Sequence, residues 1–137
     1  MDPVVHFEIP YEDKERICDF YEKAFGWGTE KLGPEMGNYV VVSTTEIDPH
    51  THRPKKPGAI NGGFYKKVAD PLSHHPSVVI AVENIYEAMK KVSEAGGKVV
   101  GGGNKKGEPD DIPGVGLFIS ILDTEGNRVS LLQPRGM

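Results

Sequence analysis

The feature of this sequence that most constrains its fold is an order of short elements that occurs twice. Each time, a strand-like run opens the series, an amphipathic helix follows it, and three further strand-like runs come after the helix. The first series occupies about residues 4–67 and the second about residues 77–134. The order βαβββ written twice predicts an α+β protein of two tandem modules, and 137 residues is a typical length for one domain.

Both predicted helices have recognisable ends. Asp13 or Glu12 is suited to start the first helix, and Gly26 is suited to end it. The signal for the second helix lies in residues 84–97, with Asn84 as the predicted N-cap and Gly96-Gly97 as the predicted end. The apolar stripe of the first helix is Ile17, Phe20, Tyr21, Ala24 and Phe25. The predicted strands are 4–9, 27–32, 39–43 and 59–66 in the first module and 78–82, 98–100, 115–122 and 128–133 in the second.

The opening strand carries an unusual pair of polar residues. Side chains alternate between the two faces of a strand, so Val5, Phe7 and Ile9 share one face, and His6 and Glu8 share the other. In a concave pocket, desolvation would raise the pKa of Glu8 and make it a general base with His6 as its partner. The alternative is a hydrogen-bonded carboxylate–imidazole pair that stiffens the fold. His6 and Glu8 are therefore the candidate catalytic residues.

Composition excludes several classes of function. The formal net charge is −4 and the calculated pI is near 5.7, which gives no basic surface for nucleic acid or an anionic membrane. No apolar run approaches the ~20 residues of a membrane span. The single cysteine, Cys18, excludes an internal disulfide and suits a reducing compartment. We therefore expect a cytoplasmic protein.

Two segments interrupt the regular pattern. Residues 44–58 are rich in proline and charge, and residues 101–116 contain many glycines, so we expect both to be irregular loops. Long loops in a compact domain are often functional, and these two are candidate lids over a pocket. Between the last two strands, Gly126 is suited to the left-handed position of a short hairpin loop.

The doubled order, with "HFEIP…FYEKAFGW" near the start and "DTEGNRVSLLQP" near the end, resembles the vicinal oxygen chelate superfamily. That superfamily includes glyoxalase I, extradiol dioxygenases, and fosfomycin- and bleomycin-resistance proteins. The segment "PGAINGGFYKK" looks like the Gly-Gly-bearing fourth strand of its glyoxalase-like subgroup. The resemblance implies curved mixed sheets with helices on the convex side, and a cup between the modules into which His6 and Glu8 would face. It also implies a homodimer.

The resemblance allows a test of the metal site that some members of this superfamily have. His6 falls on the first of four ligand positions, but the equivalent positions in the second module are Ser77 and Ser130. Residues 50–69 contain no Asp or Glu, so the fourth strand offers no carboxylate. Catalytic metal sites typically have three protein ligands, and one imidazole with two hydroxyls falls short of that. We therefore expect no cofactor, and a divalent metal is disfavoured.

A small-molecule ligand is the expected partner instead. Gly62 and Gly63 would either admit the ligand against bare backbone or curve the sheet. The predicted ligand-binding residues are Asn61, Gly62, Gly63, Ser77, Phe118 and Ser130.

Three functions remain open, in this order. The first is a metal-independent small-molecule-binding protein of the glyoxalase/bleomycin-resistance type, with a degenerate metal site. The second is a metal-dependent lyase or dioxygenase whose altered ligand set is His6, Glu8 and a loop histidine. The third is a metal-free enzyme in which Glu8 and His6 perform acid–base chemistry on a small carbonyl compound. A methylglyoxal-detoxifying glyoxalase I is disfavoured.

Overall fold

The computed structural model describes residues 1–102 and 106–135 of the chain. The chain divides into two compact units. The N-terminal unit is His6–Pro76, and the C-terminal unit combines Ser77–Met137 with the first five residues, Met1–Val5. The backbone N–H of Ala81 donates to the carbonyl of Pro3 at 2.9 Å, which ties these first residues to the C-terminal unit. The division into one domain of two modules stays a prediction.

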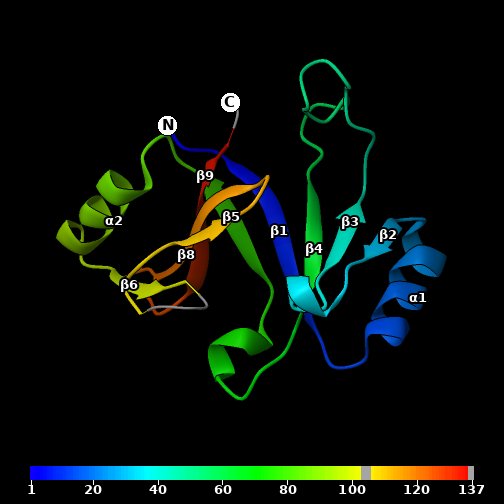
Figure 1. The fold of residues 1–137 in the computed structure, drawn as a ribbon, viewed down its shortest axis with the longest axis horizontal. Coiled ribbons are helices and arrows are strands. Elements are labelled where there is room, and N and C mark those ends of the chain that lie inside the picture. Colours follow the sequence, from blue (N-terminus) through cyan, green and yellow to red (C-terminus); the bar gives the residue numbers. More distant parts are fainter. Residues whose placement is uncertain (103–105, 136–137) are drawn as a thin grey trace. The chain divides into compact units, whose positions relative to one another are not determined.

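The N-terminal unit contains the predicted βαβββ series (Figure 1). Its strands lie in the order β2-β3-β4-β1; β3 is antiparallel to both of its neighbours, and β4 is parallel to β1. Two short 3-10 helices, Pro34–Met36 and Pro71–His74, complete the unit. The elements are β1 (Val4–Tyr11, of which the first two residues belong to the C-terminal unit), α1 (Lys14–Phe25), β2 (Gly28–Lys31), β3 (Val40–Ser43) and β4 (Asn61–Lys66).

The C-terminal unit repeats the series with one extra strand. Its strands lie in the order β5-β9-β8-β6, with β7 paired to β8, and every pair except the parallel β5–β9 is antiparallel. The elements are β5 (Ser77–Ala81), α2 (Ile85–Glu94), β6 (Lys98–Gly101), β7 (Asp110–Ile112), β8 (Gly116–Leu122) and β9 (Arg128–Pro134). The α+β fold and its mixed sheets are confirmed.

The extra strand corrects one prediction. Residues 101–116 were expected to be irregular, but Asp110–Ile112 pairs with the start of β8 as a tight hairpin. Gly114, with a φ of 75°, lies in the turn, and Val115 N–H donates back to Ile112. The Gly-rich composition therefore marks a hairpin turn here. Residues 103–105 of this predicted loop lie outside the described residues. The other predicted loop, residues 44–58, contains no named helix or strand, as expected.

The helix ends follow the sequence signals. Asp13 is the N-cap of α1, and its carboxylate accepts from the Arg16 N–H at 3.0 Å. Gly26, with a φ of 70°, ends that helix. Asn84 accepts from the backbone N–H groups of the first turn of α2. Gly126 lies in the β8–β9 turn with a φ of 81°, as predicted. None of the helices in the described ranges is long and apolar enough to span a membrane.

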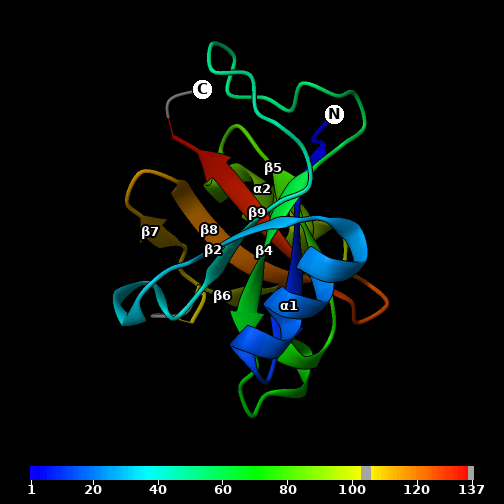
Figure 2. The same cartoon turned by 90° about the vertical axis from the view of Figure 1, so that its right-hand side faces the viewer.

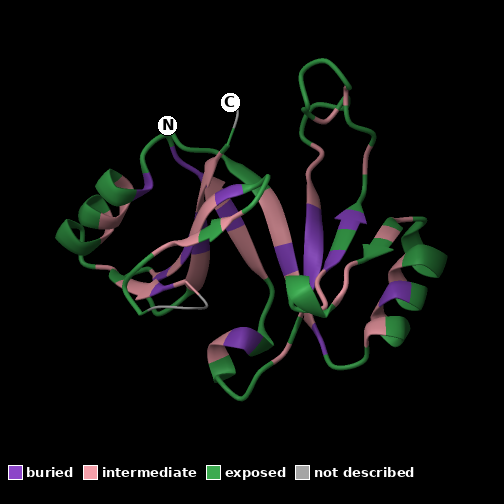
Figure 3. Ribbon diagram, viewed as in Figure 1, coloured by how far each residue is buried: buried purple, intermediate pink, exposed green. Residues whose placement is uncertain are grey.

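In the N-terminal unit, α1 covers one face of the sheet (Figure 2). The buried residues lie on the strands and on the inner side of α1 (Figure 3). They are Tyr11, Cys18, Val40, Val42 and Phe64, with Phe7, Ile9, Ile17, Tyr21 and Trp27 packed against them. Phe7 and Ile9 therefore lie on the helix face of β1, as the alternation predicted.

Three apolar residues do not lie where the pattern placed them. Phe20 and Phe25 are 56% and 63% exposed, although both belong to the predicted stripe of the first helix. The buried face of α1 is centred on Ile17, Cys18 and Tyr21, so Phe20 lies on its flank and Phe25 at its end. Val5 is 38% exposed and does not join Phe7 in the core.

In the C-terminal unit, α2 covers one face of the second sheet. The buried cluster is Val82, Ile85, Ile119, Ile121 and Leu131, with Ile80, Ala88, Met89, Val92, Val99, Leu117 and Val129 packed against it. Alternation then leaves the neighbouring positions of β5, β8 and β9 on the opposite face.

Candidate functional site

The face of β1 opposite α1 holds a hydrogen-bonded chain of three side chains, all within the N-terminal unit. The hydroxyl of Tyr39 donates to Oε2 of Glu8 at 2.9 Å, and the oxygen of the same Tyr39 hydroxyl lies 3.1 Å from Nε2 of His6. Glu8 is only 8% exposed, and His6 is half-buried. The structure thus brings His6 and Glu8 together through Tyr39, which the sequence analysis did not identify.

Burial keeps the imidazole of His6 and the phenol of Tyr39 neutral. Desolvation lowers the pKa of His6 below its ordinary value, because burial disfavours the charged imidazolium. The pKa of Tyr39 is raised far above its ordinary value by burial, by the charge of Glu8 and by the hydrogen bond to Glu8. At neutral pH, Tyr39 is therefore a phenol that keeps its proton, and His6 is a neutral imidazole.

Two adjacent glycines of β4 make room for this arrangement. Gly62 and Gly63 pair with Phe7 and Glu8 of β1, so they face opposite sides of the sheet. A Cβ on Gly62 would overlap the ring of Phe7, and a Cβ on Gly63 would overlap the ring and hydroxyl of Tyr39. The side chains that approach these glycines closely are thus Phe7 and Tyr39. A ligand-binding role for Gly62 and Gly63 stays a prediction.

The amide of Asn61 is used for a loop contact. Its Oδ1 accepts from the backbone N–H groups of Thr44 and Thr45 at 2.7 and 3.1 Å. These bonds hold the start of the 44–58 loop to β4 at the point where the loop leaves β3. Recognition of a ligand by Asn61, which stays a prediction, has to use the remaining donors of this amide.

The three predicted ligand-binding residues of the C-terminal unit share one face of its sheet. Ser130 is opposite Val79 in the β5–β9 register, so it lies on the same face as Ser77. Phe118 is opposite Leu132, two residues from Ser130, and therefore lies there too. This face is the one opposite α2.

The two serines of this face differ in their hydrogen bonding. Ser130 is fully buried, and its hydroxyl lies 3.3 Å from that of Ser120. The Oγ of Ser77 is also buried and has no hydrogen-bond partner in the described part of the chain. The unit therefore carries neutral hydroxyls where the resemblance places two ligands of a metal.

Comparison with known families decides the wider assignment. The family model of the Glyoxalase/Bleomycin resistance protein/Dioxygenase superfamily matches residues 4–131. The chain belongs to this superfamily. The resemblance inferred from the sequence is therefore confirmed.

Solved structures of the same fold are similar over nearly the whole chain. A hypothetical protein from Bacillus halodurans has a TM-score of 0.67 at 11% identity, covering 99% of this chain and 96% of that one. A methylmalonyl-CoA epimerase variant from Streptomyces coelicolor, in complex with 2-nitronate-propionyl-CoA, has a TM-score of 0.66 at 14% identity, covering 98% and 96%. A superfamily member from Vibrio splendidus has a TM-score of 0.60 at 12% identity, covering 97% and 99%. No curated protein sequence matches the chain.

The donor set of this superfamily member does not fit a transition metal. In the described part of each unit, no three side chains of His, Cys, Asp and Glu gather closely enough to hold an ion. Nε2 of His6 is engaged with Tyr39, and Ser77 and Ser130 are neutral hydroxyls that zinc, nickel or iron bind poorly without deprotonation. We therefore derive no chemistry through a metal.

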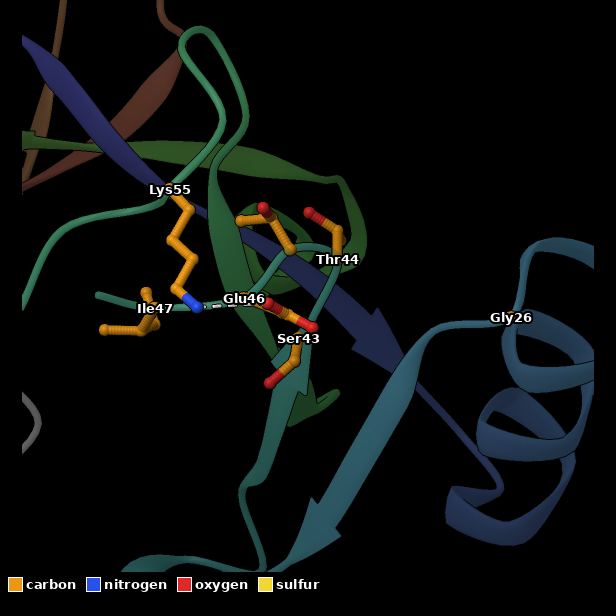
Figure 4. Close-up of a pocket in the computed structure, with 7 residues that line it drawn as sticks. Gly26, Ser43, Thr44, Glu46, Ile47 and Lys55 are labelled. Carbon is orange, nitrogen blue, oxygen red and sulfur yellow. Dashed lines mark hydrogen bonds and ion pairs between the residues drawn. The ribbon is translucent and has the colours of Figure 1, made fainter. Parts of the chain in front are cut away.

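A surface hollow of about 590 Å³ lies elsewhere in the N-terminal unit (Figure 4). Gly26 lies at one side of it, and Lys55 and Glu46 form an ion pair of 3.3 Å at the other. Its lining residues are Gly26, Ser43, Thr44, Thr45, Glu46, Ile47 and Lys55. None of them is a predicted site residue, although Asn61 fixes the backbone of two of them.

Of the three hydrogen-bonded side chains, His6, Tyr39 and Glu8, only Tyr39 was not predicted from the sequence. Alternation along residues 39–43 separates Tyr39, Val41 and Ser43 from the buried Val40 and Val42, so its face was readable. The missing information was the register, which places Gly63 beside both Glu8 and Val41. A tyrosine two residues before Val41 then reaches across a bare glycine toward β1.

Proposed function

We propose that this protein binds a small molecule and that the metal site of its superfamily is degenerate in it. The observation that carries the proposal is the position of Tyr39, whose hydroxyl lies between His6 and Glu8. The imidazole at the first ligand position is held by a phenol that keeps its proton. An ion at Nε2 would have to displace that contact, and the two ligand positions that the resemblance places in the C-terminal unit carry neutral hydroxyls.

Superfamily membership and the neighbours support a small-molecule ligand. Two of the similar structures are epimerases in complex with coenzyme A esters, methylmalonyl-CoA in one case and 2-nitronate-propionyl-CoA in the other. At 14% identity these show the same fold, and a common fold hosts many unrelated ligands. Small carbonyl compounds are therefore the first candidate ligands to test.

Two measurements test this proposal. Elemental analysis of untagged protein is expected to show substoichiometric metal, and thermal melting is expected to be unchanged by nickel, zinc, manganese or iron(II). A small-molecule library is expected to yield ligands that raise the melting temperature in proportion to their occupancy. Stoichiometric metal bound through His6 and two further protein groups would overturn the proposal.

The buried chain of polar side chains favours a second candidate function, metal-free acid–base catalysis on a small carbonyl compound. A carboxylate and an imidazole joined through a phenol resemble the parts from which proton-transfer sites are built. His6 would exchange the proton with the substrate, and Glu8, through Tyr39, would stabilise the charge that develops on the ring. Ligands found in the screen are tested for turnover, and Glu8→Gln separates the two functions: lost turnover with retained binding indicates an enzyme.

We propose for the same protein a cytoplasmic location and a homodimer. The single, fully buried cysteine suits a reducing compartment, and two-module members of this superfamily commonly pair to complete their cavities. Light scattering of the purified chain is expected to give twice the monomer mass of 15.0 kDa. A mass of one chain at micromolar concentration excludes the dimer.

A further inference from the structure

The hydrogen bonds around Tyr39 fix which nitrogen of His6 carries the proton. A phenol has one hydrogen, and Tyr39 donates it to the carboxylate of Glu8 at 2.9 Å. The oxygen of Tyr39 is then left with lone pairs toward Nε2 of His6, 3.1 Å away. Two lone pairs do not bind each other, so Nε2 must be the donor in this contact.

This assignment leaves the other ring nitrogen as an acceptor. A neutral imidazole has one N–H and one lone pair, so a hydrogen on Nε2 leaves Nδ1 bare. No described residue donates to Nδ1, and the ring as a whole is half-buried. Within the described part of the chain, Nδ1 of His6 thus has no hydrogen-bond donor.

We propose that the ligand of this site is a hydrogen-bond donor that binds Nδ1 of His6: an alcohol, a phenol, an enol or an amide N–H. The inference rests on the proposed small-molecule function and names the chemical class of the ligand. A carboxylate or phosphate oxygen without a hydrogen brings only lone pairs to Nδ1, so these groups are not recognised there. A buried acceptor that stays unpaired loses binding energy, and this selects against ligands that lack the donor.

Tyr39 is a positioning residue in this proposal. It does not touch the ligand, because its hydroxyl is already occupied by Glu8 and His6. Its function is to hold the imidazole ring in one orientation and one tautomer. Gly63 permits that geometry, since any side chain there would overlap the Tyr39 ring.

The tautomer is tested first, without any ligand. Long-range proton–nitrogen correlation spectra of chelator-treated, ¹⁵N-histidine-labelled protein at about pH 8 report which ring nitrogen is protonated. We expect Nε2 of His6 to carry the hydrogen and its proton to exchange slowly with water. In Tyr39→Phe that proton is expected to exchange faster, whereas Tyr86→Phe, at a 60% exposed tyrosine, should leave it unchanged. A hydrogen on Nδ1 in the wild-type protein overturns the proposal, and this spectrum decides even if Tyr39→Phe does not fold.

The ligand class is tested next with two probes of nearly equal shape. Phenol has the donor, and anisole replaces its hydrogen with a methyl group. Phenol is expected to shift the Nδ1 resonance of His6, and anisole to bind roughly fivefold more weakly, the factor that one net hydrogen bond supplies. Equal shifts from both probes, or none from either, overturn donor recognition at His6. Failure of the proposed small-molecule function would give a different result. The spectrum would still show the hydrogen on Nε2 of His6, but no compound of the library would bind.

Discussion

Gly63 lies against the ring of Tyr39 with no room between them for a single methyl group. The φ of Gly63 is outside the left-handed region, so the backbone conformation at this position does not require glycine. The glycine is therefore required by space and not by conformation. The bare backbone of Gly63 leaves the room in which the phenol of Tyr39 reaches two side chains of β1.

Replacing this glycine is expected to displace the phenol. Gly63→Ala forces a Cβ into the Tyr39 ring, and overpacking of this kind costs about 1–3 kcal/mol in the free energy of unfolding. Chemical denaturation measures the loss. Gly28→Ala is the matched control, because a Cβ on Gly28 of β2 would lie 3.7 Å from the Cβ of Ser43, an ordinary contact. Equal stabilities of the two variants would contradict the close approach.

The hydroxyl of Tyr39 is expected to contribute to stability separately from its ring. Tyr39→Phe keeps the ring in place but removes one partner from each of two polar groups, His6 and the buried Glu8. The expected loss is roughly 1–3 kcal/mol by chemical denaturation, because buried groups pay for a lost partner. Tyr86→Phe removes a hydroxyl from an exposed ring and should change the value by less than about 0.5 kcal/mol. A Tyr39→Phe variant as stable as the wild type would show that the chain of three adds nothing to folding.

The fold was predictable because its signals are local. Alternation placed Phe7 and Ile9 on the helix face of β1, and Asp13 and Asn84 began the helices as expected. The prediction for residues 101–116 was wrong in part, because composition does not report which residues pair with a neighbouring strand. A Gly-rich stretch looked irregular, yet three of its residues pair with β8 once Gly114 turns the chain.

The candidate site was predictable only in part. His6 and Glu8 stood out because they are polar residues on one face of a strand that is otherwise apolar. Tyr39 is 31 residues from Glu8, and its contact depends on the β3–β4 register, which no local signal reports. The sequence also could not show that Oδ1 of Asn61, a predicted ligand-binding residue, accepts from the loop that leaves β3. The two partners are 16 and 17 residues away along the chain.

Burial of His6 makes the stability of the protein depend on pH. The pKa of His6 is lowered by desolvation below the ordinary value of 6.5, so between these two values the unfolded chain binds a proton that the folded chain does not. The contribution of His6 to the free energy of unfolding is complete above pH 6.5. It is lost as pH falls from 6.5 to the pKa of the folded state, and below that pKa the free energy no longer changes because of His6. Urea unfolding from about pH 8 to about pH 5 should show this slope in the wild type and a smaller one in His6→Gln.

A control for this pH dependence comes from an exposed histidine. His75→Gln removes an imidazole that lies on the surface beyond the second 3-10 helix. It should retain the slope of the wild type. If His6→Gln and the wild type lose stability in parallel, the imidazole of His6 is not desolvated in the folded protein.

The 44–58 loop is expected to depend on one amide oxygen. Asn61→Ala removes the acceptor of the Thr44 and Thr45 N–H groups, so hydrogen exchange of these two amides should become faster. Asn61→Asp is the matched variant, because a carboxylate accepts the same two bonds. Exchange in Asn61→Asp is expected to stay close to that of the wild type. Slow exchange in Asn61→Ala would mean that other contacts hold the loop to β4.

The thiol of Cys18 is expected to report on opening of the N-terminal unit. It is fully buried among Tyr11, Val40, Val42 and Phe64, and burial raises its pKa, so both access and thiolate formation are suppressed. A thiol reagent should modify the folded protein slowly and the urea-unfolded chain at once. Because modification requires opening of the α1 core, Gly63→Ala should accelerate it in proportion to its loss of stability, whereas Gly28→Ala should not. Immediate reaction of the folded wild type would show that α1 does not cover this face of the sheet in solution.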